Sequence, residues 1–68
     1  MVDIENVKNY KSLFYIIDGK IHELLVIGII KNTGNIILKG INGNNQSFYP
    51  TELFYTKEEI QNLYTIRS

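Results

Sequence analysis

Short apolar segments alternate with turn-forming residues along most of this chain. The segments rich in β-branched and aromatic residues are 13–18, 20–31, 36–41 and 46–50. The turn-forming residues that separate them are 18–19, 32–35 and 42–45. Asp18-Gly19 between two such segments is a strong hairpin signal, because both central residues of the tight turn need positive φ. The pattern therefore predicts four short strands in an antiparallel meander.

The second predicted strand, 20–31, is long and carries Gly28 in its interior. A glycine inside a strand usually marks a bulge or a sharp bend. An antiparallel sheet with one wet side should alternate apolar and polar residues, but both faces of this strand are apolar. One face holds Leu25, Ile27 and Ile29, and the other holds Leu24, Val26 and Ile30. Either the terminal helix or the N-terminal arm covers the outer face, or that face is left for a partner or a second copy of the chain.

A helix start follows the last strand. Thr56 is suited to be the N-cap, and Glu59 three residues later completes a capping box. Ile60, Leu63 and Tyr64 recur at helical spacing and share one face. We therefore expect an amphipathic helix that packs back on the sheet and closes the open end of its core.

The length of 68 residues allows a single domain. We expect residues 1–11 to form an N-terminal arm or a short helix, 12–55 the strands of a β-barrel, and 56–66 the C-terminal helix. Thr51–Phe54 is expected to form a single turn or a short fifth strand. The chain has no cysteine and one histidine, so neither a disulfide nor a metal or cofactor site is expected.

Charge and composition restrict the partners, the cellular compartment and the type of genome that we expect for this protein. Seven basic residues balance seven acidic ones, which argues against strong non-specific attraction to a polyanion. The N-terminus lacks the pattern of a signal peptide, and the longest apolar run, 24–30, is too short to span a bilayer, so we expect a cytoplasmic protein without a membrane partner. The chain is rich in Ile, Asn and Lys and contains no alanine. This bias indicates an AT-rich genome, such as that of a low-GC bacterium or its phage.

No catalytic constellation is evident. His22 and Glu23 are neighbours in a predicted strand and point to opposite faces, so they cannot share a site. Glu58 and Glu59 diverge by about 100° on the predicted helix and are typical of helix-start charges. We therefore expect a protein that is not an enzyme.

The tyrosines are the candidates for partner contacts. Five tyrosines and three phenylalanines make the chain rich in aromatic residues, most of which should lie in the core or at its rim. Tyr15, Tyr49 and Tyr55 flank turns and strand ends, and tyrosine is common at protein interfaces. Tyrosines can also stack on bases, but the lysines of this chain are scattered among acidic residues instead of forming a basic groove.

The order of these signals resembles a known kind of small protein. The residues that carry the resemblance are Asp18-Gly19, Ile21, Val26, Gly28, Gly34, Gly43 and the segment 52–60, ELFYTKEEI. Over residues 13 to 64 they resemble small SH3-like β-barrel proteins of the kind encoded by phages and bacterial mobile elements. The resemblance implies a mostly β fold, a small antiparallel barrel of four to five strands with a short C-terminal α-helix.

The functional expectation combines this resemblance with the lack of catalytic residues. We expect a non-catalytic protein-binding module, an accessory protein of a phage or mobile element that binds and inhibits a host protein in the manner of an anti-CRISPR protein. One alternative is a nucleic-acid-binding SH3-like module that uses Tyr and Lys side chains on the sheet. Another is a self-associating structural protein, with the second strand or an exposed edge pairing across a homodimer.

Overall fold

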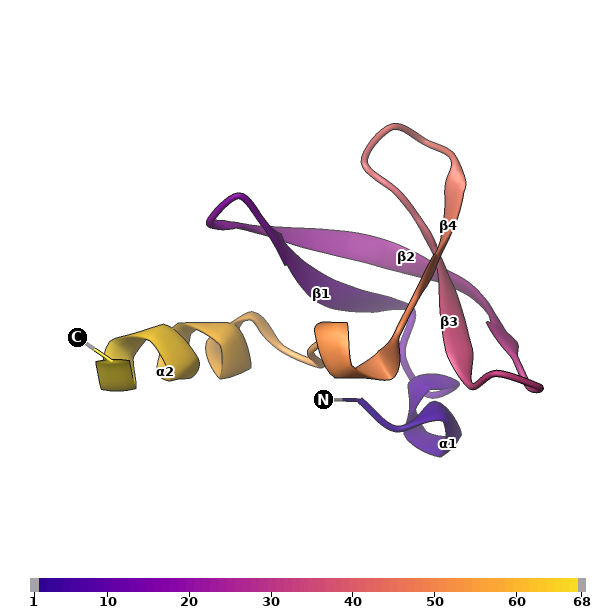
Figure 1. The fold of residues 1–68 in the computed structure, drawn as a ribbon, viewed down its shortest axis with the longest axis horizontal. Coiled ribbons are helices and arrows are strands. Elements are labelled where there is room, and N and C mark those ends of the chain that lie inside the picture. Colours follow the sequence, from indigo (N-terminus) through magenta and orange to yellow (C-terminus); the bar gives the residue numbers. More distant parts are fainter. Residues whose placement is uncertain (1, 68) are drawn as a thin grey trace.

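The computed structural model describes the backbone of residues 2–67 and the side chains of residues 2–63. The elements in chain order are α1 (Ile4–Val7), β1 (Ser12–Ile17), β2 (Lys20–Ile30), β3 (Asn35–Lys39), β4 (Asn45–Phe48), a 3-10 helix η1 (Pro50–Glu52) and α2 (Lys57–Arg67). The four strands form one unclosed antiparallel sheet in the order β1-β2-β3-β4 (Figure 1). The prediction of a mostly β protein with four antiparallel strands and a C-terminal helix is confirmed.

The hairpin between β1 and β2 forms as its turn residues predict. Asp18 has a φ of 50° and Gly19 a φ of 78°, so both central residues occupy the left-handed region. The turn sets a register in which Ile17 faces Lys20 and Leu13 faces Leu24. Side chains on one face of this hairpin therefore alternate with those on the other.

The predicted irregularity at Gly28 is confirmed as a bulge in β2. Val26 pairs with Leu38, but the next pair joins Gly28 to Ile37, so β2 contains one extra residue there. Residues 20–25 pair with β1 and residues 26–30 pair with β3. One strand thus belongs to two hairpins, and Figure 1 shows the β3–β4 hairpin crossing β2.

The apolar core lies on the side of the sheet that the two hairpins enclose. Its buried members are Val2, Val7, Leu13, Leu24, Ile36, Leu38, Phe48 and Leu53. Among the side chains that the structure describes, no polar or charged one is buried. The core is therefore held by apolar contact, the term that dominates the stability of a small domain.

The end of the core is sealed by the N-terminal segment, which corrects the prediction for the C-terminal helix. Val2 and Val7 are both buried in the core, and the amide of Val2 donates to the Pro50 carbonyl at 3.2 Å. Ile60 is 1% exposed but lies outside that cluster, and Leu63 is 52% exposed. In Figure 1, α1 and η1 lie together beneath the sheet, while α2 leads away from them.

The prediction that the shared apolar face of α2 packs on the sheet is therefore wrong for Leu63, and the side chain of Tyr64 lies outside the described residues. The core cluster already contains Leu53, which precedes α2, and it does not include Ile60. Among the apolar residues of α2 whose side chains are described, Ile60 is buried and Leu63 is exposed.

The start of α2 is nevertheless determined locally, as predicted. Thr56 Oγ1 accepts from the Glu59 amide at 3.2 Å. In return, Glu59 Oε1 accepts from the amides of Thr56 at 3.2 Å and Tyr55 at 3.1 Å. These bonds satisfy amides at the helix start that have no partner within the helix.

For the segment before α2 the sequence allowed either a single turn or a short fifth strand, and the structure contains a form of both. It begins with η1 and ends with a single antiparallel bridge between Phe54 and Phe14. The Phe14 amide donates to the Phe54 carbonyl at 2.9 Å, and the Phe54 amide returns a bond of 3.0 Å. The bridge covers one residue of the free edge of β1 and leaves the sheet unclosed.

The burial of Ile36 predicts a large loss of stability on truncation. Replacement Ile36→Ala should lower the free energy of unfolding by about 2–5 kcal/mol. A core of this size supplies only about 3–5 kcal/mol in total, so the variant should retain little stability at 25 °C. The matched change Leu63→Ala, at an exposed helix position, should alter the free energy by less than about 0.5 kcal/mol. Urea unfolding followed by circular dichroism measures both, and equal losses would contradict the assigned core.

Candidate functional site

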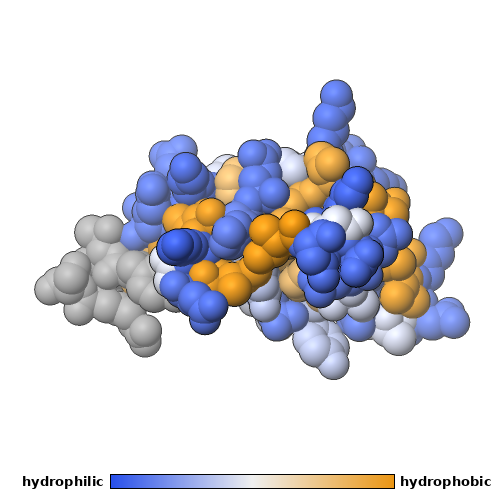
Figure 2. Space-filling model, turned by 90° about the horizontal axis from the view of Figure 1, so that it is seen from above, coloured by the Kyte–Doolittle hydropathy of each residue, from blue (hydrophilic) through white to orange (hydrophobic). Residues whose placement is uncertain are grey.

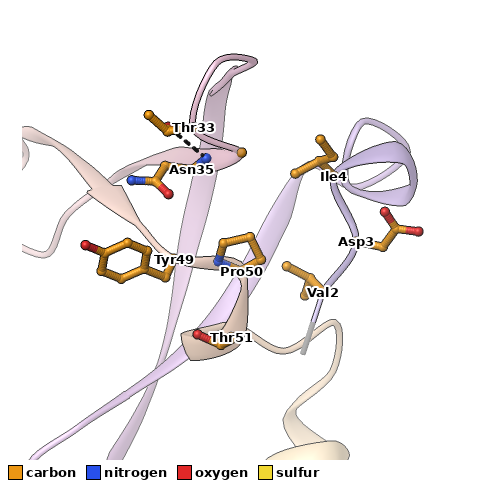
Figure 3. Close-up of a pocket in the computed structure, with 9 residues that line it drawn as sticks. Val2, Asp3, Ile4, Thr33, Asn35, Tyr49, Pro50 and Thr51 are labelled. Atoms are coloured by element: carbon orange, nitrogen blue, oxygen red, sulfur yellow. Dashed lines mark hydrogen bonds between the residues drawn. The ribbon is translucent and has the colours of Figure 1, made fainter.

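A shallow hollow lies where three segments distant in sequence meet. Its volume is about 750 Å³, and its walls are residues 2–4, the β2–β3 turn at 33–35, and residues 49–51 at the start of η1 (Figure 3). Concave surfaces of this size with mostly apolar walls are common binding sites in proteins.

Hydrogen bonds donated by backbone amides hold the three walls. The bond from the Val2 amide to Pro50 ties the N-terminal wall to η1. The Gly34 amide donates to the Ile30 carbonyl at 2.8 Å and closes the β2–β3 turn, in which Gly34 adopts a φ of 77°. The Tyr49 amide donates to Glu52 Oε2 at 3.0 Å and directs the chain into η1. The hollow is therefore formed by well-bonded backbone instead of by loose loops.

The polar side chains of the hollow bond mostly to the protein itself. Thr33 Oγ1 accepts from the Asn35 amide at 3.2 Å, the contact that Figure 3 marks with a dashed line. Asn35 Nδ2 donates to Ser47 Oγ at 3.3 Å. Asp3 Oδ1 accepts from the Glu5 amide at 3.2 Å. Because these groups already have partners, the surface best able to gain from a ligand is apolar and is supplied mainly by Ile4, Tyr49 and Pro50.

The three predicted contact tyrosines have different positions. Tyr49 is 63% exposed at the rim of the hollow. Tyr15 packs against the core, with its ring edge-to-face on Phe48 at 4.8 Å between centroids. The tyrosines do not share one exposed surface, and their role in binding stays a prediction.

Tyr55 holds the N-terminal segment in place. Its ring stacks on Tyr10 with 4.7 Å between centroids, and its hydroxyl accepts from the Asp3 amide at 2.8 Å. It also packs against the core. Tyr55 thus supports one wall of the hollow without lining it.

A second apolar surface lies on the sheet. We call it the outer face; it comprises Phe14, Ile16, Ile21, Leu25 and Ile27. Leu25 is 55% exposed and Ile27 is 50% exposed, and the other three are half-buried. The prediction that Ile29 shares this face with Leu25 and Ile27 is wrong: the register shift at the bulge turns Ile29 to the core side, where it packs against the core. Whether a partner meets the open residues Leu25 and Ile27 stays a prediction. Figure 2 shows hydrophobic residues reaching the surface between hydrophilic ones.

Sequence reasoning missed two of the three walls of the hollow. Residues 2–4 belong to a segment predicted only as an arm or short helix, and 33–35 were assigned only as a turn. The one local signal was Tyr49 next to Pro50, an aromatic residue that directly precedes a helix-starting proline. The contact between Val2 and Pro50 spans most of the chain, and no local pattern encodes it.

Comparison with known proteins finds no matching family model, no matching curated protein and no matching solved structure. Within residues 2–67, no helix is both long and apolar enough to cross a membrane. In the same part of the chain, His, Asp and Glu residues form no group of three or more that could hold a metal ion.

The role of Tyr55 predicts an effect on the N-terminal wall. Replacement Tyr55→Phe removes the acceptor of the Asp3 amide and should lower the free energy of unfolding by about 0.5–1 kcal/mol. Amide hydrogen exchange should accelerate in α1, which this bond anchors. The matched change Tyr49→Phe removes an exposed hydroxyl and should stay within about 0.5 kcal/mol of the wild type. Unchanged exchange in α1 after Tyr55→Phe would show that the bond does not hold this segment.

Proposed function

We propose that the protein is a non-catalytic protein-binding module and that the hollow at Tyr49 is its contact site. The observation that carries this proposal is the position of Tyr49, which is 63% exposed beside a hollow of about 750 Å³. An exposed tyrosine beside an apolar concavity offers a large, rigid contact area and a hydroxyl for orientation. Such aromatic residues are enriched among those that dominate binding energy at protein interfaces.

The chemistry of the hollow favours an apolar side chain from a partner protein. Ile4 and Pro50 present apolar surface, and the neighbouring polar side chains bond internally. None of the nine described lining residues is basic, and Asp3 is acidic. A nucleic-acid backbone would meet no compensating positive charge there, so this site supports protein binding over nucleic-acid binding.

The proposal includes an SH3-like barrel as the fold type. Three features support it: the bend in β2 at Val26–Gly28, the 3-10 helix η1 after β4, and the bridge that returns Phe54 to the free edge of β1. Together they give a bent meander whose last extended residue pairs with its first strand. These features support, within an unclosed sheet, the barrel type that the resemblance of residues 13 to 64 implies.

The proposed biological role is that of an accessory protein of a phage or mobile element that binds a host protein and inhibits a defence nuclease. Its support is the small size, the AT-rich codon bias of the composition and the resemblance of residues 13 to 64. The direct test adds the purified protein to purified CRISPR nucleases of low-GC bacteria and measures DNA cleavage. Unchanged cleavage across such nucleases would remove this role and would leave the binding proposal standing.

The binding proposal predicts capture that depends on Tyr49. Immobilised wild-type protein should retain a specific protein from a lysate of a low-GC bacterium, and Tyr49→Ala should reduce the retained amount at least roughly tenfold, because truncation of an interface hot spot costs about 2 kcal/mol or more. Quantitative mass spectrometry of the retained proteins gives the measurement.

The matched control is Ile41→Ala, which truncates a side chain that is 62% exposed and does not line the hollow. This variant should retain the same protein at the wild-type level. Recovery of nothing above background, or equal recovery with Tyr49→Ala, would refute the hollow as the contact site.

A further inference from the structure

The turn between β3 and β4 joins an asparagine to a glycine. Asn42 is the one asparagine of this chain that a glycine follows. Both residues are exposed and lie outside the strands. Such a pair is chemically reactive, because the backbone nitrogen of the second residue can attack the side-chain carbonyl carbon of the first. Glycine has no side chain that obstructs this attack.

The Asn42 carboxamide is folded back over its own turn. Its Oδ1 accepts from the Asn44 amide at 3.1 Å, so the side chain curls toward the backbone that follows it. The same oxygen lies 3.2 Å from the place that a Cβ on Gly40 would occupy, so the missing side chain there leaves room for it. A donor at this oxygen stabilises the negative charge that develops when a nucleophile adds to Asn42 Cγ. The bond from Asn44 thus prepares Cγ as an electrophile.

The nucleophile of this reaction is the backbone nitrogen of Gly43. Gly43 has a φ of 87°, and no atom of the described residues, apart from its chain neighbours, lies within 4 Å of a Cβ built on it. Water and hydroxide therefore reach this part of the turn. The Gly43 amide donates to the Gly40 carbonyl at 2.9 Å, and this bond has to open before the nitrogen can attack. An exposed turn can open locally while the core stays folded.

We propose that Asn42 is a site of spontaneous deamidation. Gly43 N forms a bond to Asn42 Cγ, the bond from Cγ to Nδ2 breaks, and the amide proton of Gly43 leaves with the side-chain nitrogen as ammonia. Water then adds to either carbonyl carbon of the resulting succinimide ring and breaks the bond from that carbon to Gly43 N. Opening at Cγ gives aspartate. Opening at the main-chain carbonyl carbon gives isoaspartate, in which the backbone runs through Cβ and Cγ.

The modification changes the charge of the chain, and isoaspartate also changes the turn. A carboxylate replaces a neutral amide, so the formal net charge, zero in the unmodified chain, becomes negative. The extra backbone carbon of isoaspartate lies between Gly40 and Asn44, whose backbone groups bond at 2.8 Å, so the pairing of β4 should weaken at this end. Neither Asn42 nor Gly43 lines the hollow, so the reaction is independent of the proposed binding site.

Incubation of the purified protein at mildly alkaline pH, followed by peptide mass spectrometry, tests this site. Acid should form at residue 42 faster than at Asn44 or Asn45, which are exposed nearby but precede larger residues. The rate should rise with pH, because hydroxide removes the Gly43 amide proton. Isoaspartate should be among the products, because direct hydrolysis of the side-chain amide gives aspartate alone. Lack of acid at residue 42, or aspartate without isoaspartate, would overturn the proposal.

Two variants separate ring closure at Asn42 from general lability of the turn. Asn42→Ser removes the carboxamide, while its hydroxyl can still accept from the Asn44 amide. This variant should lose the acidic form that ion-exchange chromatography detects after incubation of the wild type. The matched change Asn44→Ser leaves Asn42 and Gly43 in place and should form acid at residue 42 as the wild type does. Circular dichroism would verify that both variants fold. An equal amount of the acidic form from Asn42→Ser would refute Asn42 as the site.

Discussion

The bend in β2 is the constraint on which the other features of this structure depend. A straight strand of eleven residues would extend about 36 Å, close to the longest dimension of the molecule, 37 Å. The bulge between Val26 and Gly28 instead turns the second half of β2 toward β3. As a result Leu38 and Ile36 lie in the same core as Leu13 and Leu24, which belong to the first hairpin. A four-stranded sheet thereby encloses apolar volume that a flat meander of this length would leave open.

The enclosed core still has an open end, and the way it is sealed links stability to the candidate site. Val2 and Val7 enter this end from the N-terminal side, and Leu53 enters it from the segment after η1. The backbone that carries these residues also forms two walls of the hollow, which are joined by the bond from Val2 to Pro50. In a domain with so small a stability margin, the elements that hold the core and those that shape the hollow are the same.

Both exposed apolar surfaces result from the short length of the chain. A short chain has too few residues to cover both faces of its sheet once the core has been closed. The N-terminal segment is used to seal the core, and α2 contributes Ile60 from its first turn, so Leu25 and Ile27 stay half-exposed. Tyr49 is exposed for a related reason, because it lies where the chain leaves β4 and begins η1. Proteins that cannot bury such surface alone commonly bury it against another chain.

The sequence by itself determined the features whose causes are local. Positive φ at Asp18 and Gly19, the bulge at Gly28 and the bonds between Thr56 and Glu59 follow from side chains within a few residues of each other. Only the tertiary structure decided which apolar groups fill the core, because that depends on segments far apart in the chain meeting in space. Periodicity predicted burial for Leu63 and an arm or short helix for residues 1–11, yet the latter segment carries Val2 and Val7 into the core. Local patterns describe which face of an element is apolar, but the volume that remains once the strands have packed decides which of those faces is buried.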